Sequence, residues 1–444
     1  MIRQNFNADW TVEKGDGNSR MNSFLGNTQT KTVHLPYDAM IHEARTPDTK
    51  NGAQTGFYPG GEYIFQKHFT APQAWQGKPV SLVFEGVYQT ALVYLNGWLL
   101  TRNVNGYAEF TVEAGPYLKY GADNLLKVIA DNSLEPNSRW YTGSGIYRPV
   151  RLLVGNKVYL PQDTVRITTR EADEGFALLD VTAQVQSAST VTERVTLQQT
   201  ICREGTAVLT DRQNLLLQPG ESRTVSFRYC VDSPALWSPE NPNLYTSTMQ
   251  VLEGEEELDR EETGFGIRTL SIDAAHGVRI NGQTVKLRGA CIHHDNGILG
   301  AATLPDAEER RIRQLKEAGF NAIRSSHHPA GRALLDACDR YGVLVMDELS
   351  DVWNVRKNPY DYALYFEQDW KPTIQKMVAK DYNHPSVILY CVGNEISEVG
   401  SESGAETNRR LCNTFRELDP PATPPTPSTA LWQPVTACGR SWVM

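Results

Sequence analysis

The run VILYCVGNEIS (387–397) constrains the fold of this chain more than any other feature. Six apolar residues in a row are typical of a parallel strand that is buried on both faces. The run then ends abruptly on Asn394 and Glu395. Barrel enzymes place their chemistry at the carboxyl ends of such strands, so the pattern predicts that Glu395 is catalytic. The alternative is a strand-end glutamate that caps the following helix.

Four strand and helix patterns alternate between residues 269 and 419. The strand runs are TVKLRGAC, NAIRSSHH, VLVMDELS and VILYCVGNE. The helical runs are PDAEERRIRQLKEAGF, for which we predict Asp306 as the amino-terminal cap, RALLDACDRYG, WKPTIQKMVAKDYNHP and SGAETNRRLCNTFRELD. Four successive β/α units predict the first half of a (β/α)8 TIM barrel.

Two β-rich segments precede the partial barrel. Residues 1–156 contain short alternating strands, and Asn96-Gly97 between apolar flanks is a strong hairpin signal. This segment predicts a jelly-roll β-sandwich, and the family resemblance described below implies that it is a sugar-binding domain. Residues 157–268 have the strand spacing of an immunoglobulin-like β-sandwich. The expected fold is therefore multidomain, with two sandwiches followed by a partial barrel.

Composition excludes several partners. The 444 residues carry a net charge of −9 with a pI near 5.6. This acidic balance argues against binding to nucleic acid or to an anionic membrane, because both require a basic surface. No run approaches the roughly 18 apolar residues of a membrane span, and the amino terminus lacks the apolar segment of a secretion signal. Seven cysteines without metal-like spacing indicate reduced thiols. We expect a cytoplasmic protein.

Each predicted barrel strand ends in polar side chains that converge at one rim when a barrel closes. They are His293, His294, Asp295, Arg324, Ser326, His327, His328, Asp347, Glu348, Asp351, Asn394 and Glu395. Such a cluster suits the hydroxyl groups of a sugar, with Trp353, Trp140 or Tyr141 as stacking faces. For the tryptophans the alternative is ordinary core packing, and for each histidine a structural role. A metal site is the competing interpretation, but no HExxH-like spacing supports it.

Five motifs carry a resemblance to a known family. They are RWYTGSGIYRPVRL (139–152), KLRGACIHHDNG (286–297), AIRSSHHP (322–329), LLDACDRYGVLVMDE (334–348) and DYNHPSVILYCVGNEIS (381–397). In this order they resemble glycoside hydrolase family 2, the group of β-galactosidases, β-glucuronidases and β-mannosidases.

The resemblance implies roles for individual residues. Glu395 falls on the general acid/base and Asn394 on the residue that binds the sugar 2-hydroxyl. His293, His327 and Arg324 match residues of the sugar subsite, while Asp347 and Glu348 match a pair that chiefly supports it. The segment LSDVWN departs from the metal-binding form of some β-galactosidases, so we expect neither a metal nor a cofactor.

The implied reaction is retaining hydrolysis of a β-galactoside, with a β-glucuronide or β-mannoside as alternative substrates. It needs two carboxyl groups about 5–5.5 Å apart, one acid and one nucleophile. We expect apolar surroundings and a second nearby carboxylate to keep Glu395 protonated. The family's nucleophile, a glutamate on a later strand, has no counterpart here. Residues 420–444 form an irregular tail with six prolines between Pro420 and Pro434.

We therefore expect a truncated or frame-shifted chain with little activity alone, and a possible homo-oligomer in the full-length form. Two other functions remain open from sequence. The chain could be a non-catalytic carbohydrate-binding protein, or a fragment that complements a second chain.

Overall fold

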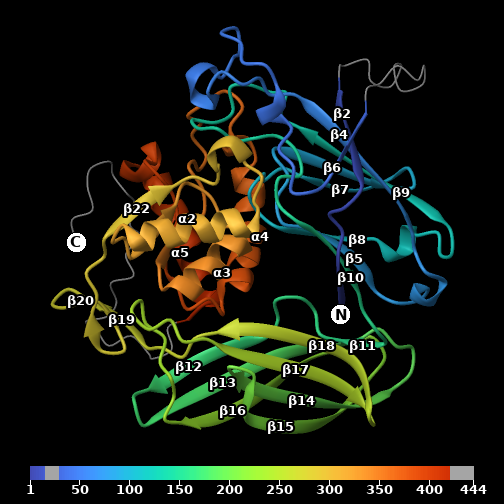
Figure 1. The fold of residues 1–444 in the computed structure, drawn as a ribbon, viewed down its shortest axis with the longest axis vertical. Helices are drawn as coiled ribbons and strands as arrows, with labels where there is room; N and C mark the ends of the chain where they lie inside the picture. The colour runs from blue at the N-terminus through green and yellow to red at the C-terminus, as the bar shows by residue number, and fades with distance from the viewer. Residues whose placement is uncertain (16–29, 421–444) are drawn as a thin grey trace.

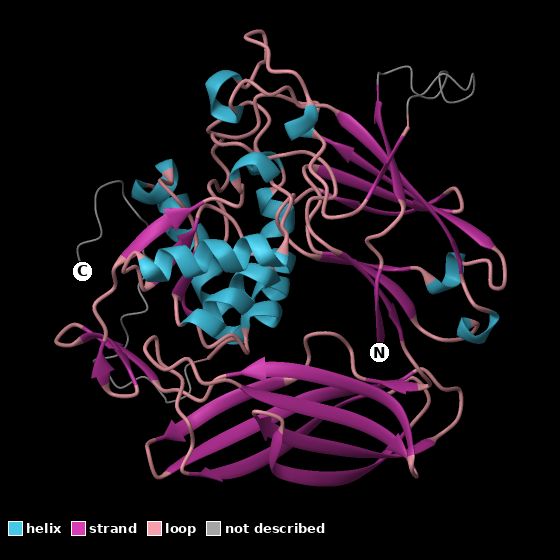
Figure 2. Cartoon of the chain, viewed as in Figure 1, coloured by secondary structure: helices cyan, strands magenta, loops and turns pink. Residues whose placement is uncertain are grey.

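A computed structural model describes residues 1–15 and 30–420 of the chain, arranged in three parts (Figures 1 and 2). Two β-sandwiches, coloured blue to cyan and green to yellow-green in Figure 1, flank a helix-rich unit in orange and red. This order confirms the predicted fold class. The predicted tail lies outside the described residues from 421 onward. No helix in the described ranges combines the length and apolarity needed to cross a membrane.

The amino-terminal sandwich consists of a four-stranded sheet, β1-β10-β5-β8, and a six-stranded sheet, β3-β2-β4-β9-β6-β7. Its strands are β1 Ile2–Asn5, β2 Trp10–Gly15, β3 Lys31–Val33, β4 Glu62–Thr70, β5 Val80–Phe84, β6 Thr90–Leu95, β7 Trp98–Asn103, β8 Phe110–Glu113, β9 Asp123–Asp131 and β10 Val150–Val154. Alternate side chains fill one core between the sheets, as the burial pattern of β9 shows. Asn96 and Gly97 join β6 to β7 with positive φ at both positions, so the hairpin prediction is confirmed.

The second sandwich pairs its strands in two four-stranded antiparallel sheets. One contains β11, β12, β13 and β16, and the other has the order β15-β14-β17-β18. The strands are β11 Val158–Tyr159, β12 Arg166–Ala172, β13 Phe176–Ser187, β14 Glu193–Arg203, β15 Thr206–Leu217, β16 Ser222–Asp232, β17 Tyr245–Glu253 and β18 Glu256–Phe265. A small sheet follows, formed by β19 Leu270–Asp273, β20 Gly277–Ile280 and β21 Gln283–Thr284.

The third part is a four-stranded parallel sheet in the order β22-β23-β24-β25, with helices between successive strands. Its elements are β22 Gly289–Ile292, α2 Pro305–Glu317, β23 Ala322–Ser325, α3 Arg332–Tyr341, β24 Leu344–Glu348, α4 Phe366–Asp381, β25 Val387–Cys391 and α5 Glu402–Leu418. Every residue of the two central strands is buried, whereas both outer strands are partly exposed. The described residues thus form the expected partial barrel.

The predicted cap of α2 is wrong by two positions. The structure has Leu304 as the amino-terminal cap without a side-chain hydrogen bond, and Pro305 opens the helix. Proline suits this position because its φ is already helical and the amide hydrogen it lacks would have no partner there. Asp306 lies in the first turn instead, where its charge still favours the helix dipole.

A partly buried ion cluster joins all three parts. Arg332, at the start of α3, donates to both carboxylate oxygens of Glu109 in the first sandwich at 2.8 and 3.0 Å. The same guanidinium donates to Asp163, which belongs to the second sandwich, at 3.0 Å. Arg151 adds a further bond to Glu109 at 3.2 Å. Burial acts to raise the pKa of Glu109, but the charges of Arg332 and Arg151 outweigh it and lower the pKa to about 2.

Replacing Arg332 by methionine should lower the free energy of unfolding by about 2–3 kcal/mol, between the values for exposed and fully buried pairs, because two partly buried carboxylates lose their shared cation. Since the folded-state pKa of Glu109 lies below its ordinary value of 4.5, the wild-type stabilisation is present above that pH and is lost as pH falls toward 2. Chemical denaturation at several pH values measures both effects. The control is Arg340→Met, which breaks an exposed pair with Glu309 and should cost less than about 1 kcal/mol. Equal losses in the two variants would contradict the assignment.

Candidate active site

The four strand ends of the partial barrel converge as predicted, and a buried ion pair lies at their centre. Arg324, which ends β23, donates through Nε to one oxygen of Glu348 at the end of β24. His327 contacts the other Glu348 oxygen through Nδ1 at 2.8 Å. Glu348 has no exposed surface. Burial acts to lower the pKa of Arg324, but the charge of Glu348 outweighs it, so the pKa is raised and the guanidinium stays charged.

The side chain of Asn394 connects this ion pair to a second one. Its carboxamide oxygen accepts a hydrogen bond from Arg324 at 3.1 Å, and its amide nitrogen donates to Asp351 at 2.8 Å. Lys357 donates to the backbone oxygen of Asn394 at 2.7 Å and to Asp351 at 2.9 Å. Burial opposes ionisation of Asp351, but the hydrogen bonds from Arg139 and Asn394 lower its pKa. Asn394 is therefore held in one orientation at the floor of the site.

Glu395 follows Asn394 at the rim and has a different environment from the one we predicted. Its side chain is 49% exposed, and its Oε2 accepts a hydrogen bond from Arg139 at 3.0 Å. Its backbone adopts φ of 43°, an uncommon conformation for a residue with a β-carbon. The expected apolar enclosure is absent among the described residues, because the loop after β25 is open to solvent and a guanidinium lies beside the carboxylate.

Asp347 lies behind the site and faces away from it. It is fully buried, and its Oδ1 accepts hydrogen bonds from the backbone amides of Ala330 at 2.8 Å and Glu348 at 3.0 Å. Burial first, and then the charge of Asp381, raise its pKa well above the ordinary value. We grouped it with the substrate-binding residues, but its position has no access to a sugar. It supports the loop that carries His327.

The two predicted stacking tryptophans have different positions. Trp140 reaches the rim from the first sandwich, with its ring 5.0 Å from that of His293 and 5.5 Å from that of His327. Trp353 is fully buried, donates to the backbone oxygen of Val392 at 2.8 Å and packs among apolar residues of α4 and α5. Core packing is therefore the correct interpretation for Trp353, and its prediction as a sugar-stacking residue is wrong.

The four histidines separate into two pairs. His293 and His327 line the rim, and burial together with the His327 ring lowers the pKa of His293. His294 and His328 are buried behind them and contact each other at 3.2 Å. Burial lowers the pKa of His294 to about 3, so it is neutral. For this second pair the structural interpretation is the right one.

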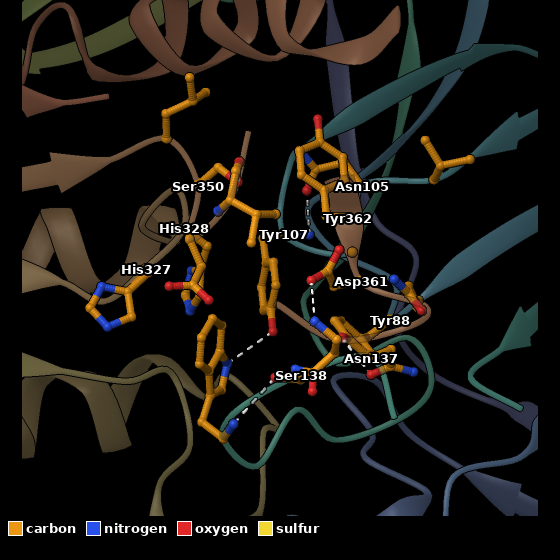
Figure 3. Close-up of a pocket in the computed structure, with 18 residues that line it drawn as sticks. Tyr88, Asn105, Tyr107, Asn137, Ser138, His327, His328, Ser350, Asp361 and Tyr362 are labelled. Atoms are coloured by element: carbon orange, nitrogen blue, oxygen red, sulfur yellow. Dashed lines mark hydrogen bonds between the residues drawn. The ribbon is translucent and has the colours of Figure 1, made fainter. Parts of the chain in front are cut away.

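A pocket lies where the first sandwich meets the barrel rim. His327, His328 and Asp351 line it from the barrel, and Tyr107 and Trp140 line it from the sandwich. Figure 3 shows the ring of Tyr107 lying flat against that of His328, and their centres are 3.9 Å apart. The two domains therefore form a polar and aromatic pocket, and Asp351 in its lining is hydrogen-bonded to Asn394.

Comparison with known proteins assigns this architecture to a family. Three family models match successive parts of the chain. "Glycosyl hydrolase 2 galactose-binding domain-like" matches residues 10–176, "Glycosyl hydrolases family 2" matches 158–268, and "Glycosyl hydrolases family 2, TIM barrel domain" matches 274–424. The chain belongs to glycoside hydrolase family 2.

Relatives within glycoside hydrolase family 2 differ in the activity that their names state. β-Galactosidase BoGH2A of Bacteroides ovatus is 37% identical over 91% of this chain and 48% of its own length. A putative β-glucuronidase of Formosa agariphila is 32% identical over 90% of this chain and 38% of its own. The crystal structure of a family 2 member from Bacteroides cellulosilyticus superposes with a TM-score of 0.91 at 36% identity, covering 95% of this chain and 55% of that one. The chain spans about half the length of such relatives.

Arg139 and Lys357 are site residues that we did not predict from the family 2 motifs. Arg139 stands beside Trp140, but its partners Asp351 and Glu395 are 212 and 256 residues away in sequence. Lys357 lies in the loop after β24, where the sequence has no strand or helix period. Arg139 is also the first residue of the motif RWYTGSGIYRPVRL, which was the available signal for it.

Among the described residues, Asp336, Asp339 and His384 bring three possible metal-binding atoms close together. Asp339 already accepts hydrogen bonds from the Ser386 amide at 3.0 Å and contacts His384 Nδ1 at 2.6 Å. These contacts account for the cluster as a brace between α3 and the start of β25. The oxygens of Asp351 at the site are likewise bonded to Arg139, Lys357 and Asn394.

Replacing Glu348 by glutamine should lower the free energy of unfolding by about 3–5 kcal/mol, because Arg324 stays buried without a counter-charge. Chemical denaturation measures the loss. The matched control is Glu367→Gln, in an exposed pair with Arg410, which should cost less than about 1 kcal/mol. If the two variants were equally stable, the central ion pair would not hold the site together.

Proposed function

We propose that this chain contributes the proton-donor side of a retaining exo-β-glycosidase that acts on β-galactosides. Glu395 is the general acid and base, and Asn394 binds the 2-hydroxyl of the sugar. The observation that carries the proposal is the placement of Asn394 and Glu395 at the carboxyl end of β25, with Asn394 held between Arg324 and Asp351. His293, His327 and Trp140 complete the wall of the sugar subsite on this side.

The second carboxyl group of the reaction must be free to attack the anomeric carbon. Glu348 is bonded to Arg324 and His327, and Asp351 is bonded to Arg139 and Lys357. Both carboxylates are therefore occupied as structural anions. We infer that the nucleophile comes from a segment outside the described residues.

Charge compensation favours a neutral sugar over a uronic acid. Within the described residues, three cations lie at the site, and each already contacts a carboxylate other than the proton donor Glu395: Arg324 contacts Glu348, and Lys357 and Arg139 contact Asp351. A glucuronate carboxylate would need a cation without such a partner, and none of these three is one. The similarity to the Bacteroides ovatus β-galactosidase agrees with this choice. β-Glucuronide stays the second candidate, because several relatives carry the name β-glucuronidase.

Binding tests the choice of sugar without turnover. A non-hydrolysable alkyl β-thiogalactoside at ten times its Kd should stabilise the chain by about 1.4 kcal/mol, seen as a rise in Tm. Asn394→Ala should abolish the shift, since the 2-hydroxyl loses its partner. The corresponding β-thioglucuronide at the same concentration should give a smaller shift. A larger shift with the glucuronide would overturn the galactoside assignment.

Turnover tests the role of Glu395. The chain should release little phenol from phenyl β-galactoside, and more when azide is added, because a small anion can take the place of the attacking carboxylate. Phenol leaves slowly unless it is protonated, so Glu395→Gln should lower the azide-supported rate by at least about 100-fold, the usual contribution of a general acid. Glu398→Gln, a change three residues along the same loop, serves as the control. A rate that is the same with and without Glu395 would show that this residue is not the proton donor.

A further inference from the structure

Arg139 reaches from the first sandwich into the barrel rim and uses all three of its nitrogens there. Nε and one terminal nitrogen donate to the two oxygens of Asp351 at 3.0 and 2.6 Å. The other terminal nitrogen donates to Oε2 of Glu395 at 3.0 Å. A guanidinium held at three points cannot rotate, because its donors lie in one rigid plane.

Both ends of this contact are anchored. Trp140, the next residue, donates its indole hydrogen to the hydroxyl of Tyr107 at 3.1 Å, and Tyr107 stacks on His328 of the barrel (Figure 3). On the other side, Asp351 is held by Lys357 and Asn394. The position of Arg139 relative to β25 is therefore set by contacts in both domains.

The side chain of Glu395 needs a partner that fixes its orientation. A half-exposed glutamate side chain has several rotamers of similar energy, and fixing one costs conformational entropy. Its backbone, with φ of 43°, is itself in an unfavourable region for a non-glycine residue. Within residues 1–15 and 30–420, the hydrogen bond from Arg139 is to Oε2 of Glu395, and Oε1 accepts none from it.

We propose that Arg139 is a positioning residue for Glu395: it holds Oε2 and leaves Oε1 as the atom that delivers the proton. The proposal rests on the proposed function. In the glycosylation step, the proton moves from Oε1 to the glycosidic oxygen, which takes the bonding electron pair as its bond to the anomeric carbon breaks. The attacking carboxylate forms the new bond to that carbon. Glu395 is left as a carboxylate, and Arg139 lies beside the charge that appears.

The amino-terminal sandwich therefore does more than provide a wall of the pocket. Through Arg139 it determines the orientation of the acid carried by the barrel. Lysine at this position would keep a positive charge. Its single ammonium group could not contact both oxygens of Asp351 and Oε2 of Glu395 at the same time.

The test measures the accessibility of the Glu395 carboxyl directly. Wild type, Arg139→Met and Arg139→Lys are treated with a water-soluble carbodiimide and glycine ethyl ester, and labelling of Glu395 is quantified by peptide mass spectrometry. Arg139→Met should raise the labelling rate about three- to fivefold, the range an exposed ion pair contributes. Arg139→Lys should give an intermediate rate. Arg409→Met, which breaks an exposed pair with Glu406 on α5, should leave Glu395 unchanged.

Equal labelling of Glu395 in wild type and Arg139→Met would overturn the proposal. Unchanged Tm values among the variants establish that the labelling reflects local release and not unfolding, and Arg139→Lys provides a second comparison if the methionine variant unfolds. Because the assay involves no sugar, it separates the two proposals. Failure of galactoside binding would leave the role of Arg139 in place, and failure of labelling would leave the sugar assignment in place.

Discussion

The contact on which the rest of the structure depends is the partly buried cluster of Arg332 with Glu109 and Asp163. Each charge is costly to remove from water, so the cluster is stable only when all three parts of the chain contribute their members. It thereby fixes the first sandwich against the partial barrel. The loop that carries Arg139 and Trp140 belongs to that sandwich, and its place at the rim follows from the docking.

In the site, as in that cluster, positively charged side chains contact negatively charged ones. Arginine and lysine side chains alternate with carboxylates from Arg139 through Asp351 and, by way of Asn394 and Arg324, to Glu348. Along this series of contacts each charge has a partner of opposite sign, as low-dielectric surroundings favour. This arrangement leaves amide and imidazole groups, but few free charges, for a ligand. Such a surface suits neutral hydroxyl groups.

Side chains from two of the domains that the family 2 models match meet at the site. The described barrel strands provide Asn394 and Glu395, and the first sandwich contributes the side chains that contact them. The chain covers about half the length of relatives such as the Bacteroides ovatus β-galactosidase.

Local patterns in the sequence determined the fold class, the hairpin at Asn96-Gly97 and the placement of Asn394 and Glu395 at a strand end. These features depend on periodicity and turn chemistry within a few residues. Tertiary structure alone decided that Trp140 lines the site while Trp353 is core, that Asp347 faces away, and that Glu395 meets Arg139. Those outcomes depend on docking between separate domains, across 256 residues for the last pair, and no local pattern records which side chains meet when two folded surfaces pack together.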